Sequence, residues 1–124
     1  MMEARMEQLR NDYGYLCSDL GLRSDSDQLF DQLDAAYSQS TRAYHNWEHI
    51  FDCIQRLSFI RFNLSEPAVI EFALYYHDVI YEPKNNDNEE LSAQFASGVI
   101  LKYGGSEKTA QRVSSLIELT KHHA

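Results

Sequence analysis

The sequence predicts an all-α protein, a helical bundle of about six helices. Apolar residues recur at intervals of three and four through most of the 124 residues, and no segment alternates between apolar and polar residues as a strand does. Helix caps, glycines and prolines separate the apolar stripes. With 44% hydrophobic residues, we expect residues 1–124 to form one domain around a buried core.

The N-terminal half accounts for three helices. The first has an apolar face within residues 2–20 and stops at the glycine that follows. The second carries its stripe through residues 29–37, with Ser24 or Ser26 as the expected N-cap. The third begins near Asn46. Its stripe consists of Trp47, Ile50, Phe51, Ile54 and Leu57.

The C-terminal half accounts for three more. Residues 65–67 open the fourth helix with a capping serine, an acid that faces the positive helix end and a proline in the first turn. Its apolar stripe runs on to His77. Asp87, with a glutamate three residues later, resembles a capping box for the fifth helix. Two glycines at 104–105 end that helix, and Ser106 caps the sixth.

The net charge indicates which partners are unfavourable, and the cysteines indicate the cellular compartment. A net charge of −8 argues against nucleic acid or an anionic membrane as the main partner, although a bound metal would still admit a phosphorylated small molecule. Cys17 and Cys53 fall in amphipathic patterns and are expected to be buried free thiols, as in a reducing cytoplasm. No signal peptide or membrane-length apolar run is apparent. We therefore expect a cytoplasmic protein.

His77 and Asp78 are the strongest candidates for chemistry. His77 lies on an apolar stripe, so the alternative is that it is simply a buried core residue without a chemical role. Asp78 follows directly, and adjacent residues on a helix point about 100° apart, so both reach one cation only where the helix frays. Burying a carboxylate without a partner is costly, and a divalent cation is an efficient partner.

His49 projects away from the apolar stripe of its helix, so packing explains it less well. Imidazole and carboxylate ligands together suit Mn, Fe, Co, Ni, Zn or Mg, and the apparent absence of nearby cysteines argues against a structural zinc of the thiolate kind. Residues 45–49 also match the His-x-x-Glu-His pattern of inverted zinc proteases. As an N-cap, Asn46 would leave His45 outside the helix and spoil that geometry, so the protease is the lesser alternative.

Four blocks follow one another in the chain: residues 44–50, 75–81, 87–93 and 117–123. In this order they resemble the HD-domain superfamily, whose members are HD-domain-like bundles of helices and act as metal-dependent phosphohydrolases. More narrowly, they resemble the bacterial family of predicted metal-dependent HD phosphohydrolases. The resemblance implies that His49, His77 and Asp78 bind a divalent metal, whose activated water cleaves a phosphomonoester or nucleotide.

The resemblance also suggests residues around the metal. Asp87 and Glu89 would act as acid–base groups or support the ligands, with helix capping as the alternative role. His123 would face the pocket and bind substrate phosphate or a second metal, unless it and His122 are simply solvated. Arg42 is a candidate phosphate contact, or else an ordinary exposed arginine.

One ligand of the superfamily is missing. Its fourth ligand is an aspartate on a later helix, whereas no acid follows Glu118 here, so we expect the chain to lack the C-terminal part of the family fold. Water or a borrowed carboxylate would fill the gap, and the exposed apolar interior would favour self-association into a homo-oligomer. Two alternatives follow: a non-catalytic module that binds a nucleotide or metal, and a di-iron oxygenase that uses His122 and His123.

Overall fold

The computed structural model describes residues 2–122, with the side chains of residues 3–121. Within these residues the fold is all-helical and contains no strand, which confirms the predicted fold class. The helices are α1 (Met2–Asp19), α2 (Ser26–Tyr37), α3 (Trp47–Ile60), α4 (Pro67–Tyr76), α5 (Asn88–Lys102) and α6 (Glu107–Leu119), with the short 3₁₀ helices η1 (Arg61–Asn63) and η2 (Thr120–His122). In this part of the chain, no helix has both the length and the apolar character needed to cross a membrane.

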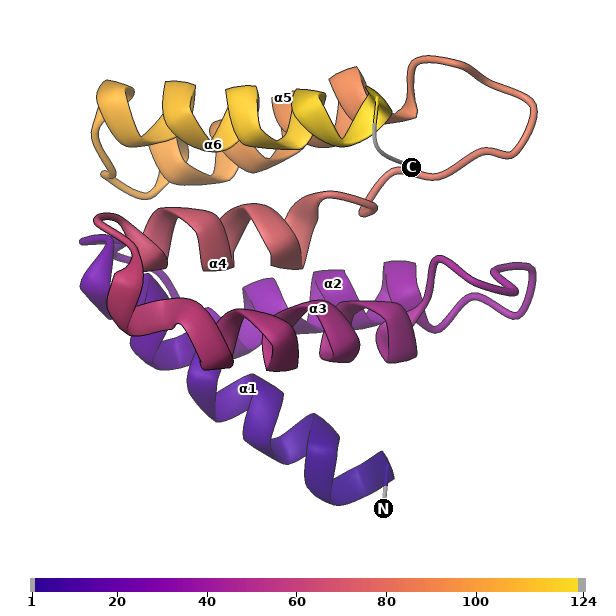
Figure 1. Ribbon diagram of the computed structural model, residues 1–124, viewed down its shortest axis with the longest axis horizontal. Coiled ribbons are helices and arrows are strands. Elements are labelled where there is room, and N and C mark those ends of the chain that lie inside the picture. The colour runs from indigo at the N-terminus through magenta and orange to yellow at the C-terminus, as the bar shows by residue number, and fades with distance from the viewer. Residues whose placement is uncertain (1, 123–124) are drawn as a thin grey trace.

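Helix α4 is the centre of the bundle. It contacts α1, α3, α5 and α6, and it is the most apolar helix of the fold. Figure 1 shows α5 and α6 as an antiparallel pair on one side of α4, with α3 on the other side. Phe72, Tyr75 and Tyr76 of α4 are fully buried, because neighbours cover this helix on most of its circumference.

Buried tyrosines join α4 to the N-terminal helices. The hydroxyls of Tyr13 and Tyr76 are hydrogen-bonded at 2.7 Å, and the Tyr37 hydroxyl donates to the carbonyl oxygen of Tyr75 at 2.7 Å. Each of these three tyrosine hydroxyls thus has a partner, which avoids the cost of burying an unpaired polar group. These bonds fix the rotation of α4, and so the direction in which its C-terminal end points.

Two predicted N-caps are confirmed. The Asn46 side chain accepts from the backbone N–H groups of Glu48 and His49, and Ser106 Oγ accepts from the N–H of Thr109. Because Asn46 is the cap, α3 begins at Trp47 and His49 lies in its first turn.

The predicted cap of α2 is wrong by one residue. Asp25, not Ser24 or Ser26, occupies the N-cap position, and its carboxylate accepts from the N–H groups of Asp27 and Gln28. All three residue types can cap a helix, and a carboxylate also interacts favourably with the positive helix end. Ser26 is therefore the first helical residue.

Helices α4 and α5 have no side-chain cap, contrary to prediction. Ser65 lies before the N-cap residue Glu66, and Pro67 in the first turn lacks one of the N–H groups that a cap would satisfy. Asp87 occupies the N-cap of α5, but its ψ of 19° is far from the extended conformation that directs a side chain back to the first turn. The predicted capping box is therefore wrong.

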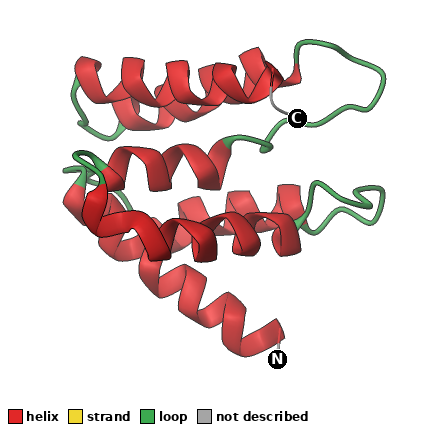
Figure 2. Cartoon of the chain, viewed as in Figure 1, coloured by secondary structure: helices red, strands yellow, loops and turns green. Residues whose placement is uncertain are grey.

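Two long loops lie at the same end of the bundle. Residues 38–46 connect α2 to α3, and residues 77–87 connect α4 to α5. Figure 2 shows both loops projecting in the same direction, at the end where α6 also finishes. Residues distant in the sequence therefore meet at this end.

Glu71 of α4 gives the bundle a pH-dependent contribution to stability. Burial raises its pKa above the ordinary 4.5, and the ion pair with Arg61 of η1 offsets this only in part. Since its pKa in the folded protein exceeds that in the unfolded chain, the stability it contributes is present below pH 4.5 and is lost as the pH rises through the folded-state pKa. The isosteric E71Q variant lacks this titrating group. Between acidic and neutral pH, its free energy of unfolding should therefore rise relative to that of wild type.

Urea unfolding at a series of pH values measures this shift. The exposed Glu118 supplies the control, because E118Q should follow the wild-type profile at every pH. Parallel wild-type and E71Q profiles would contradict the assignment.

Candidate metal centre

His49 and His77 face each other across the gap between α3 and the end of α4. Their Nε2 atoms are 3.1 Å apart, and Asp78 Oδ2 lies 3.6 Å from His49 Nε2 and 3.5 Å from His77 Nε2. Two nitrogen ligands of one tetrahedral zinc ion lie about 3.3 Å apart. The structure thus brings the three predicted ligand residues to the separation that a shared cation needs.

The end of α4 explains how two adjacent residues converge. The helix stops at Tyr76, and His77 keeps helical angles as its C-cap before the chain turns away. His77 Nδ1 lies 2.7 Å from the carbonyl oxygen of Leu74 and donates to it. With Nδ1 engaged in this bond, Nε2 is the ring atom that faces His49 and can offer a lone pair to a cation.

Asp78 is held from its other side by His45. The half-buried carboxylate accepts from His45 Nδ1 at 2.8 Å, through the same Oδ2 atom that faces His49 and His77. His45 precedes the N-cap of α3, so it does not share a helical face with His49 as the protease motif requires. It instead orients the acid.

Arg42 binds backbone carbonyl groups. It is buried, and its guanidinium donates to the carbonyl oxygens of His45, Asp78 and Val79 at 3.2, 2.7 and 2.9 Å. The alternative that Arg42 is an ordinary exposed arginine is therefore wrong, and the phosphate contact stays a prediction. Arg42 joins the loop before α3 to the loop after α4.

Helix α5 anchors the second loop. Ser92 Oγ accepts from the N–H of Ile80 at 3.0 Å and lies 3.2 Å from its carbonyl oxygen, while the Asn88 side chain bonds both backbone groups of Glu82. The ring of Tyr81 stacks on His45 with centroids 4.0 Å apart. The backbone that carries His77 and Asp78 is thereby fixed.

The protonation state of His49 suits a metal ligand. Burial lowers its pKa below the ordinary 6.5, and the neighbouring His77 lowers it further, against the opposing charge of Asp78. Divalent cations bind the neutral imidazole, so a lowered pKa reduces the competition from protons.

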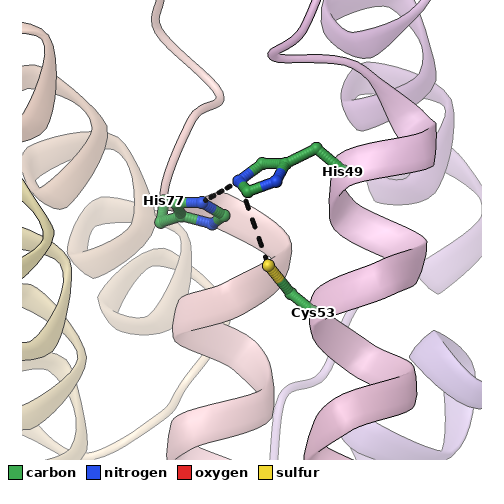
Figure 3. Close-up of side chains that lie close together, drawn as sticks. All are labelled: His49, Cys53 and His77. Carbon is green, nitrogen blue, oxygen red and sulfur yellow. Dashed lines mark hydrogen bonds between the residues drawn. The ribbon is translucent and has the colours of Figure 1, made fainter. Parts of the chain in front are cut away.

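Cys53 is a site residue that the sequence analysis missed. Its Sγ lies 3.9 Å from His49 Nε2, and one ligand atom from each of His49, Cys53 and His77 lies within 4.8 Å of the others (Figure 3). The expectation that no cysteine is near the metal ligands is therefore wrong. The four-residue spacing of His49 and Cys53, which places both on one helical face, was the available signal.

A cavity of about 440 Å³ opens beside these residues. Glu89 lines it, whereas Asp87 is exposed and is not part of its wall. His123 lies outside the described residues. The lining residues are Tyr44, His45, His49, Cys53, Leu74, His77, Asp78, Glu89, Leu116, Leu119 and Thr120.

No family model matches the chain, and no curated protein or solved structure matches it significantly. The resemblance of residues 40–124 to the HD-domain superfamily therefore stays a prediction from the sequence. The function is therefore inferred from the arrangement of this chain's own residues.

Proposed function

We propose that the protein is a metal-dependent phosphohydrolase of the HD type. The observation that carries the proposal is the convergence of His49, His77 and Asp78, from two separate helix ends, on one point beside a cavity. The cavity is of a size for a small molecule such as a phosphomonoester or nucleotide.

The donor set fits a divalent cation. His49 Nε2, His77 Nε2 and Asp78 Oδ2 would hold it, and the carboxylate would offset part of its charge. When bound, such a cation lowers the pKa of a water molecule and polarises a phosphoryl oxygen. The bond from His77 to Leu74 and that from His45 to Asp78 keep the ligand atoms oriented.

Glu89 is the best-placed group for proton transfer. It comes from the first turn of α5, is half-buried and lines the same cavity as the two histidines. A carboxylate there can accept a proton from the attacking water or orient it. The free thiols of Cys17 and Cys53 agree with the proposed cytoplasmic location.

The direct test is metal content followed by activity. Protein purified without chelator should contain about one divalent metal ion per chain and should release phosphate from a panel of phosphomonoesters and nucleotides with at least one of Mn, Mg, Co, Ni or Zn. Thermal stabilisation by a nucleotide without phosphate release would instead indicate a binding module. Two irons per chain would indicate the di-iron alternative.

Glu89 and Asp87 form a matched pair for testing the proton-transfer role. E89Q should lower kcat about 10²-fold or more and leave metal content unchanged, because it removes the base and not a ligand. D87N should retain wild-type kcat, since Asp87 is exposed outside the cavity. Steady-state kinetics measures kcat, and elemental analysis measures the metal content of each variant. An equal fall in kcat in E89Q and D87N would contradict the role of Glu89.

A further inference from the structure

We infer that Cys53 is a ligand of the same cation, so that the centre is a zinc or cobalt site rather than a magnesium or manganese site. The inference rests on the proposed metal centre and adds a fourth residue to it. The thiol, two imidazoles and a carboxylate would bind the ion together.

The geometry of α3 supports this assignment. Cys53 follows His49 by one helical turn, so a single rigid helix presents both side chains on one face (Figure 3). Cys53 Sγ lies 3.9 Å from His49 Nε2, and nitrogen and sulfur ligands of one tetrahedral zinc lie about 3.6 Å apart. His77 Nε2, 3.1 Å from the same His49 atom, completes a triangle of ligand atoms.

The surroundings of Cys53 differ from those of a packing cysteine. Cys17 is 3% exposed and belongs to the hydrophobic core, whereas Cys53 is half-buried and lines the cavity beside both histidines. Both thiols are free, so no disulfide competes for Cys53.

The donor set determines the metal. Thiolate is a soft ligand that favours zinc and related ions, whereas magnesium and manganese prefer oxygen ligands. The charges of the Cys53 thiolate and the Asp78 carboxylate would together neutralise a divalent cation. With four protein ligands, water or substrate would occupy a fifth position, as some catalytic zinc ions allow in the transition state.

Cobalt substitution tests the inference, because a thiolate ligand adds a charge-transfer band in the near ultraviolet to the visible bands of Co²⁺. Wild-type protein loaded with Co²⁺ should show both kinds of band. C53S should keep the visible bands and lose the charge-transfer band, and its zinc affinity should fall at least about tenfold. C17S is the matched control and should retain both bands.

The outcomes separate this inference from the proposed function. Visible bands without charge transfer in wild-type protein would overturn the role of Cys53 and leave the metal centre intact. No cobalt bands at all would overturn the metal centre and the proposed function with it. Loss of charge transfer in C17S, and not in C53S, would also overturn the inference. C53A provides a second variant if C53S fails to fold.

Discussion

Replacement of His77 by alanine is expected to remove bound metal and, with it, metal-dependent phosphate release. His77 Nε2 lies 3.1 Å from His49 Nε2 and 3.5 Å from Asp78 Oδ2, so it faces two of the other proposed ligands. Loss of a residue that only supports a ligand weakens metal binding about 10- to 100-fold, and loss of a ligand should therefore cost at least about 100-fold. Competition with a chromophoric chelator measures the affinity, and phosphate release measures the activity.

Asp78 allows the same test at nearly constant volume. D78N should lose metal to a similar extent, since an amide lacks the charge that offsets the cation. The exposed Asp52, which pairs with Arg56 on the same helix as His49, provides the matched control: D52N should bind metal as wild type does. Unchanged metal content in both H77A and D78N would rule out the centre.

The helices were predictable because their signals are local. A stripe of apolar residues and a cap such as Asn46 or Ser106 lie within a few residues of one another, and the structure confirms them. The caps that failed depended on backbone angles. Ser24, Asp25 and Ser26 are all competent caps, and the ψ angle of Asp87 cannot be read from its neighbours.

The candidate site was predictable only in part. The His-Asp pair and His49 stood out by motif, and the structure brings them together. Cys53 was overlooked because a cysteine in an apolar helical pattern resembles a core residue, and only the approach of α4 reveals that it faces His77. The contact between His45 and Asp78, 33 residues apart, depends likewise on tertiary packing.

Arg42 provides the largest expected effect on stability. Its guanidinium lies over the rings of Tyr37 and Tyr81, at 5.4 and 5.7 Å from their centroids, and donates to three backbone carbonyl groups at the proposed metal centre. Burial lowers its pKa, while Tyr37 and Asp78 oppose that shift. These contacts hold together two loops that have no backbone hydrogen bond to each other in the described chain.

R42A should lower the free energy of unfolding by about 3 kcal/mol, because it removes the donor from one buried and two part-buried carbonyl groups, at about 1 kcal/mol each. R42K should recover little, since an ammonium group cannot reproduce the planar fork of donors. The exposed Arg56, paired only with Asp52, is the control, and R56A should change stability by no more than about 0.5 kcal/mol. Urea unfolding compares the three variants.

Metal affinity should fall together with stability in R42A. Two of the carbonyl groups that Arg42 binds belong to His45 and Asp78, so its loss would release the acid proposed as a metal ligand and the histidine that orients it. A fall of about 10- to 100-fold, measured under conditions where the variant is still folded, would match the loss of a residue that supports a ligand. If R42A is as stable as R56A and binds metal equally well, the two loops do not depend on this side chain, and the contacts of His45 with Asp78 and Tyr81 suffice to join them.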